Sequence, residues 1–316
     1  MATANQLKTL IKSHFEDNTE RFNTVALQIA AHEAKLGHTN LANDIKKLID
    51  NAKFSKPKLR PINPDLQGLV LEIFPNERLN DLIVSDLIKG RINRIINEFI
   101  QKDKLFRHNL ENRRKILFSG PPGTGKTMTA SIIANELHLP IYVILMEKVV
   151  TKYMGETSAK LRQIFDLIED IPGVYLFDEF DAIGSQRGKE NDVGEMRRVL
   201  NSFLQFIERD HSESLIIAAT NNLELLDQAL FRRFDDVIHY HLPNDDEKIL
   251  LLKSRIGTNI NKNELVKILP QLESLSHAEI NQACLDAIKE SVLDDKKIDI
   301  NLIEKTIRER KMAYNI

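Results

Sequence analysis

Residues 120–127 (GPPGTGKT) constrain this chain more than any other stretch, because they place a phosphate-binding loop between a strand and a helix. The apolar run 115–119 predicts the strand, and residues 128–137 predict a helix with one apolar face. Backbone N–H groups of such a loop point at phosphate oxygens, and the helix N-terminus adds positive potential. Lys126 would reach the β- and γ-phosphates, and Thr127 would bind Mg²⁺. A Gly/Pro surface turn is the alternative, but the context favours a nucleoside triphosphate site.

The chain divides into three regions and a linker. Residues 1–53 carry apolar side chains at helical spacing and predict a small all-helical N-terminal domain. The segment KFSKPKLRPINP holds three prolines and indicates a linker, which we place at 54–78. From 79 to 243, apolar strand-like runs alternate with helical patterns, which predicts an α/β domain with a parallel sheet. Residues 244–316 predict a small helical domain.

Charge and cysteine content narrow the class of protein. Lys plus Arg (44) nearly balances Asp plus Glu (46), so no net positive field favours nucleic acid as a partner. The single cysteine, Cys284, lies in an apolar helical pattern and is better explained as a buried thiol than as a nucleophile. The chain has no apolar signal core and no apolar run near the ~18 residues that span a bilayer. We therefore expect a soluble cytoplasmic protein that is not bound to membranes.

A pair of carboxylates follows the apolar run 174–177, about fifty residues after the phosphate loop. At the carboxyl end of a parallel strand, Asp178 and Glu179 would emerge where ligands bind. Asp178 would hold Mg²⁺ through its water shell. Glu179 would orient or deprotonate the attacking water, which distinguishes a hydrolase from a passive nucleotide binder. An exposed acidic turn is the alternative, and the spacing from the loop disfavours it.

Two further polar groups follow the next apolar run, 215–219. Asn221 could hydrogen-bond the attacking water or the γ-phosphate, although Asn-Asn after a strand is by itself most simply a turn. Arg232 and Arg233 are adjacent and flanked by phenylalanines. Arginine suits the spread charge of a transferring phosphoryl group because its donors form a fixed, always protonated fork. Taken alone, the two arginines would be ordinary surface charge.

The ordered series GPPGTGKT, VYLFDEFDAI, AATNN and LDQALFRRFD resembles the AAA branch of AAA+ ATPases, which includes spastin, katanin and the membrane-anchored bacterial AAA proteases. The resemblance extends from about Leu79 to the C-terminus. It implies an ATPase with ATP and Mg²⁺ as cofactors and a nucleotide-dependent homo-hexamer. It assigns Asp178 and Glu179 to Walker B and Asn221 to sensor 1. Walker A and the residue after it are Gly120, Pro121, Pro122, Gly123, Thr124, Gly125, Lys126, Thr127 and Met128.

By the same resemblance, Arg233, supported by Arg232, is an arginine finger that serves a neighbouring subunit. The family pattern separates its two arginines by Pro-Gly, whereas here they are adjacent, so either could reach the neighbour's γ-phosphate. The helices after Leu242 resemble the family's lid domain. Within them, His277 and Ala278 match a segment that approaches the nucleotide and lacks a sensor-2 arginine. Residues 81–84 resemble the segment that packs on the adenine.

Tyr153, Met154 and Gly155 resemble the aromatic–hydrophobic–Gly triplet of the family's first pore loop. An aromatic ring offers a large apolar surface with few rotamers to lose, so it can grip an extended polypeptide regardless of sequence. Gly155 would make this segment a flexible loop. Residues 185–192 occupy the place of a second pore loop, and a solvated loop explains them almost as well.

Two functional hypotheses remain. In the first, a hexameric ATP-driven motor threads or remodels a protein client. In the second, ATP switches an oligomeric scaffold that regulates a partner without threading it. A nucleic-acid motor is a third and weaker hypothesis. The chain most resembles stand-alone prokaryotic AAA ATPases, which are often encoded beside a subtilisin-like protease, so such a protease is a candidate partner. The chain itself has neither a His-Glu-x-x-His nor a Gly-x-Ser-x-Gly protease motif.

Overall fold

The fold is that of a computed structural model of the 316-residue chain. It describes residues 8–10, 12–13, 19–35, 37–38, 41–45, 66, 68–150, 154–183, 190–223, 228–257, 262–295 and 297–314. The chain forms two compact units, Met1–Arg60 and Pro61–Ile316. In the first unit, helix α2 (Thr19–Lys35) buries Val25, Ala26, Ile29 and Ala30, the residues whose helical spacing predicted an amphipathic helix.

A six-stranded sheet organises the second unit, in the order β1-β3-β4-β5-β2-β6. Five strands are parallel, as the alternating pattern predicted, whereas β1 pairs antiparallel with β3 at the edge. An antiparallel edge strand needs no crossover helix, so the βα alternation could not reveal it. The strands are β1 (Val70–Ile73), β2 (Lys115–Ser119), β3 (Ile141–Leu145), β4 (Val174–Asp178), β5 (Leu215–Thr220) and β6 (Asp236–His239).

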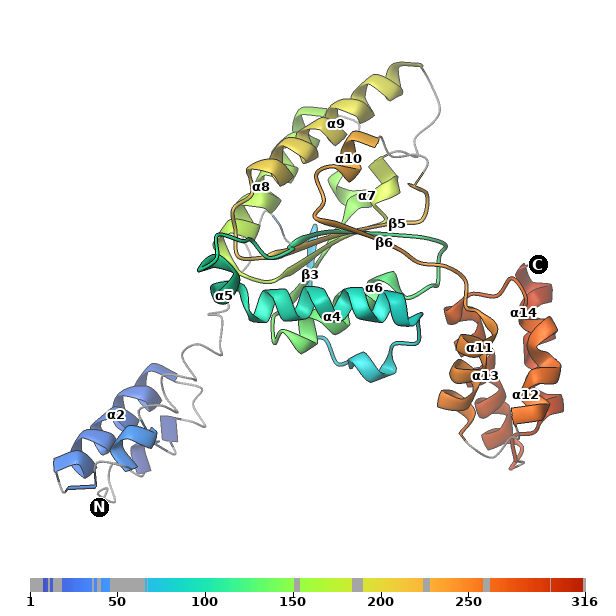
Figure 1. The fold of residues 1–316 in the computed structure, drawn as a ribbon, viewed down its shortest axis with the longest axis horizontal. Coiled ribbons are helices and arrows are strands. Elements are labelled where there is room, and N and C mark those ends of the chain that lie inside the picture. The colour runs from blue at the N-terminus through green and yellow to red at the C-terminus, as the bar shows by residue number, and fades with distance from the viewer. Residues whose placement is uncertain are drawn as a thin grey trace. The chain divides into compact units, whose positions relative to one another are not determined.

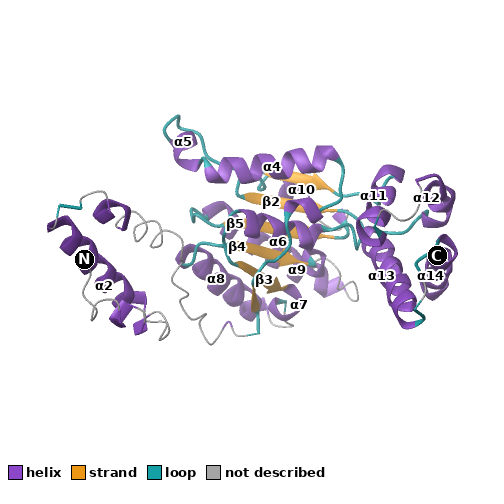
Figure 2. Ribbon diagram, turned by 90° about the horizontal axis from the view of Figure 1, so that it is seen from below, coloured by secondary structure: helices purple, strands orange, loops and turns teal. Residues whose placement is uncertain are grey.

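Helices cover both faces of this sheet, as Figures 1 and 2 show. One face packs against α4 (Asp86–Ile100) and α6 (Lys126–Glu136) in an apolar cluster that contains Ile92, Ile133 and Leu176. The other face packs against α8 (Met154–Asp170) and α9 (Glu190–Arg209), with Phe165, Phe177 and Phe203 at the centre. The short helices around the sheet are Leu79–Asp81, α5 (Lys102–Phe106), α7 (Met146–Val149), Phe180–Ile183 and α10 (Gln228–Phe231).

The C-terminal helices build a separate apolar core, in which Cys284 is fully buried. Burial raises the pKa of the Cys284 thiol to about 12, so it is unreactive at neutral pH, as expected. Asn244 and Ser276 are the N-caps of α11 and α13, and each forms a capping box. The elements are α11 (Asp245–Ile256), α12 (Lys262–Ile268), a 3-10 helix (Leu269–Leu272), α13 (His277–Leu293) and α14 (Ile300–Tyr314).

Candidate nucleotide site

The phosphate loop joins β2 to α6, and α6 begins at Lys126, two residues earlier than the apolar pattern predicted. Gly120 has a φ of 144°, and a Cβ placed there would lie 2.2 Å from the backbone oxygen of Tyr240. Gly123 has a φ of 72°, and its Cβ would lie 2.5 Å from Ser276 Oγ. Glycine is required at Gly120 because the backbone that follows β6 approaches too closely for a side chain, and it is favoured at Gly123 because that φ is left-handed.

Lys126 lies buried across the loop. Its Nζ donates to the carbonyl oxygens of Gly120 at 2.7 Å and Pro121 at 2.9 Å, and to Asn221 Oδ1 at 2.9 Å. Burial lowers the pKa of Lys126, and the nearby carboxylates of Asp178 and Asp181 oppose that shift. The ammonium is therefore held at the junction of the loop and the Asn221 turn, where a terminal phosphate could replace these neutral acceptors with charged ones.

The two carboxylates at the end of β4 lie beside the loop, as predicted. Thr127 Oγ1 donates to Asp178 Oδ2 at 2.8 Å, and Asp178 Oδ1 accepts from the Glu179 N–H at 2.9 Å. Glu179 has a φ of 51°, so the chain turns sharply where β4 ends. A hydroxyl and a carboxylate side by side suit Mg²⁺, which binds few protein oxygens and keeps several waters. Thr127 and Asp178 therefore fit this ion.

Asn221 is held by a residue that the sequence reasoning missed. Asp181 Oδ1 accepts from the backbone N–H of Asn221 at 3.1 Å and from Thr220 Oγ1 at 3.2 Å. Asp181 lies in the 3-10 helix after β4, so one carboxylate ties the ends of β4 and β5 together. Its position three residues after Asp178 is the signal that could have indicated it.

Arg232 and Arg233 follow α10, are both exposed, and lie outside the pocket that contains Lys126. Arg233 forms an ion pair with Glu208 on α9. Asp235 fastens this turn to the sheet, because its carboxylate accepts from the backbone N–H groups of Arg114 and Lys115, each at 2.9 Å. Within one chain, the fold therefore does not bring the arginines to the phosphate loop.

The proposed pore loop is described only in part. Tyr153 lies outside the described residues, and so does most of the second loop at 185–192. Met154 and Gly155 form the first turn of α8, and Gly155 is exposed. The expectation that Gly155 belongs to a loop was therefore wrong, because a helix N-terminus tolerates glycine well. Residue 190 likewise already belongs to α9.

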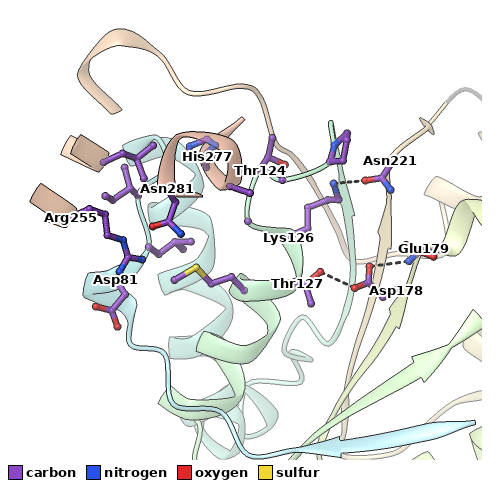
Figure 3. Close-up of a pocket in the computed structure, with 18 residues that line it drawn as sticks. Asp81, Thr124, Lys126, Thr127, Asp178, Glu179, Asn221, Arg255, His277 and Asn281 are labelled. Carbon is purple, nitrogen blue, oxygen red and sulfur yellow. Dashed lines mark hydrogen bonds between the residues drawn. The ribbon is translucent and has the colours of Figure 1, made fainter. Parts of the chain in front are cut away.

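A pocket of about 430 Å³ lies over the loop (Figure 3). Most of the predicted nucleotide-binding residues line it: Pro122, Gly123, Thr124, Gly125, Lys126, Thr127, Met128, Asp178, Glu179, Asn221, His277 and Ala278. Gly120 and Pro121 shape the loop outside this lining. The Ala278 N–H donates to the Gly123 oxygen at 3.0 Å, so α13 is docked on the loop.

Residues 81–83 line the pocket, as the resemblance implied, together with three residues of the helical domain that the sequence reasoning missed: Leu251, Arg255 and Asn281. Asn281 lies one helical turn after His277, so the periodicity of α13 could have suggested it. Leu251 and Arg255 come from α11 and carry no comparable local signal. In Figure 3, Lys126, Thr127 and Asp178 lie toward one side of the pocket and Arg255 and Asp81 toward the other, and His277 and Asn281 lie between these two ends.

Comparisons with known proteins agree with this geometry. The model of the family "ATPase family associated with various cellular activities (AAA)" matches residues 116–242. An uncharacterized AAA family ATPase of Sinorhizobium fredii is 35% identical over 304 residues, covering 94% of this chain and 92% of that protein. The chain belongs to the AAA family of ATPases. The expected α/β fold, nucleotide binding and ATP hydrolysis are thereby confirmed for this AAA ATPase.

One other relative and one solved structure bear on the family and the fold. Spastin of Xenopus tropicalis is 31% identical over 243 residues, which are 72% of this chain and 40% of spastin. The crystal structure of the FIGL-1 AAA domain has a TM-score of 0.63 and covers 82% of this chain and 96% of its own; at 21% identity it shows a shared fold. Among the described helices of this AAA ATPase, none is long and apolar enough to cross a membrane.

Proposed function

We propose that this AAA ATPase is the subunit of a homo-hexameric motor that uses ATP hydrolysis to remodel, unfold or thread a protein client. One observation carries the proposal. The pocket gathers the groups for binding and water activation, whereas Arg232 and Arg233 are exposed and absent from its described lining. A neighbouring subunit that presents these arginines would complete the site.

The pocket supports a hydrolytic mechanism in which each group has one task. Backbone N–H groups of the loop and Lys126 would hold the β- and γ-phosphates. Glu179 would accept a proton from the attacking water, and Asn221, fixed by Asp181, would orient that water or the γ-phosphate. Thr127 and Asp178 would hold Mg²⁺, which neutralises charge on the phosphates. An arginine from the neighbour would stabilise the charge that spreads over the transferring group.

Client handling is the second part of the proposal. Tyr153 would line a central pore and grip the client, with Met154 and Gly155 supporting it at the start of α8. The N-terminal helical domain, residues 1–53, lies within the compact unit Met1–Arg60 and would recognise the client or partner. The expected linker, residues 54–78, would join it to the ATPase domain, and within that range Val70–Ile73 form strand β1 of the sheet. A separate subtilisin-like protease is the candidate partner that the family resemblance suggests. We place the motor in the cytoplasm.

Arginine substitutions test the assembly. Arg233→Ala should bind ATP normally and lose about 10²-fold or more in turnover. The same measurement on Arg232→Ala shows whether Arg232 also acts as an arginine finger. Arg107→Ala, an exposed arginine beside α5, is the matched control and should retain full turnover. Mixing Arg233→Ala with Lys126→Ala subunits should restore part of the ATPase activity. The Lys126→Ala subunit keeps Arg233 and can present it to the intact nucleotide pocket of an Arg233→Ala subunit. Specific activity that stays constant down to a demonstrated monomer would contradict the proposal.

A further inference from the structure

Three polar side chains of the helical domain, Gln271, His277 and Asn281, contain buried atoms without a hydrogen-bonding partner among the described residues, and the last two line the nucleotide pocket. His277, the first residue of α13, is 9% exposed, and neither its Nδ1 nor its Nε2 forms a hydrogen bond with any described residue. Asn281, one helical turn later, has a buried Oδ1 that likewise accepts no hydrogen bond from any described residue. Buried polar groups are normally satisfied, because leaving one unpaired destabilises the fold. Two such groups four residues apart on one helix therefore need an explanation.

Both side chains line the nucleotide pocket. Residues four apart on a helix share a face, so a single ligand can meet both. The start of α13 is fixed in place, because Ala278 N–H donates to Gly123 O and Ser276 accepts from the Glu279 N–H at 3.3 Å. Docking on the phosphate loop thus directs the two unsatisfied groups toward whatever occupies the pocket.

Their position along the pocket selects the part of the nucleotide that they meet. The phosphate end is marked by Lys126 and Thr127, and the opposite end by residues 81–83. In a nucleotide, the ribose lies between the phosphates and the base, and its hydroxyls both donate and accept. A neutral imidazole offers one donor and one acceptor, and an amide oxygen accepts. Burial lowers the pKa of His277 to about 4, so the ring is neutral at pH 7 and suited to a hydroxyl.

We propose that His277 and Asn281 hydrogen-bond the ribose hydroxyls of the bound nucleotide and so tie the helical domain to the occupied site. The two residues determine sugar specificity and position α13; they take no part in the chemistry of hydrolysis. The inference rests on nucleotide binding alone, so it holds whether or not the protein acts as a hexameric motor.

Calorimetric titration of the full chain with ADP and with 2′,3′-dideoxy-ADP tests the proposal. The natural protein should bind ADP about tenfold more tightly, the loss expected when hydrogen bonds to the sugar are removed. His277→Leu and Asn281→Leu should each bring the ratio toward one, mainly by weakening ADP binding, whereas His277→Gln should retain part of it. Gln282→Ala is the matched control, because Gln282 bonds Asp286 at 2.9 Å instead of lining the pocket.

Thermal melting separates this role from a structural one. Since the substitutions remove groups that are unsatisfied in the fold, the melting temperature without nucleotide should stay the same or rise, while the increase produced by ADP should shrink. A ratio near one in the natural protein, or an unchanged ratio in both leucine variants, would overturn the proposal. A lower melting temperature with unchanged sugar preference would do the same.

Discussion

His277 should make the stability of this AAA ATPase fall in mild acid. Its pKa is lowered from 6.5 to about 4 because burial disfavours the charged ring. The unfolded chain therefore binds a proton before the folded chain does, and the free energy of unfolding decreases as the pH falls from about 6.5 toward 4. Well above pH 6.5 the ring is neutral in both states and contributes no pH dependence. Between pH 7 and pH 5 the linked loss is about 2 kcal/mol.

Urea unfolding at pH 7 and pH 5 without nucleotide measures this loss, and His277→Leu provides the reference because leucine does not titrate. The natural protein should lose about 2 kcal/mol more than the variant over this interval. Nuclear magnetic resonance titration of the His277 ring gives the pKa directly and does not depend on two-state unfolding. Equal pH dependence of the two proteins, or a ring that titrates near pH 6.5, would refute the reasoning.

Three further predictions concern the nucleotide site and the proposed pore residue. Lys126→Ala should abolish ATP binding, whereas Glu179→Gln should keep it and lose turnover; near-normal hydrolysis by Glu179→Gln would remove its assigned role. Asp181→Ala should lower kcat about tenfold with little change in ATP affinity, because the backbone of Asn221 loses the hydrogen bond to Asp181. Asp166→Ala, which removes an exposed carboxylate on α8, is the control in the same steady-state assay. Equal kcat values for the two variants would contradict the role of Asp181 in positioning Asn221. Tyr153→Ala should melt and hydrolyse ATP normally but fail to unfold a client. Retained client work would favour the regulatory scaffold, and a loss of about 3–5 kcal/mol in stability would mean that Tyr153 is a core residue.

The amino-acid sequence alone determined the phosphate loop, the carboxylates at the end of β4 and the asparagine after β5. Each is a local pattern, in which the residues that carry the chemistry stand directly after an apolar strand. Parallel strands bring their carboxyl ends to one edge of a sheet, so the order of these patterns also predicted that Lys126, Asp178 and Asn221 meet. The capping boxes at Asn244 and Ser276 are local patterns of the same kind.

Only the tertiary structure decided the contacts between distant segments. It placed β1 antiparallel at the edge, paired Arg233 with Glu208, and set Asp181 against the Asn221 turn. It also docked α13 on Gly123, which left the buried atoms of His277 and Asn281 at the pocket without a hydrogen-bonding partner in the part of the chain that the structure describes. Whether a side chain is buried and hydrogen-bonded depends on which surfaces pack together. No local sequence pattern predicts the packing of residues that lie far apart in the chain.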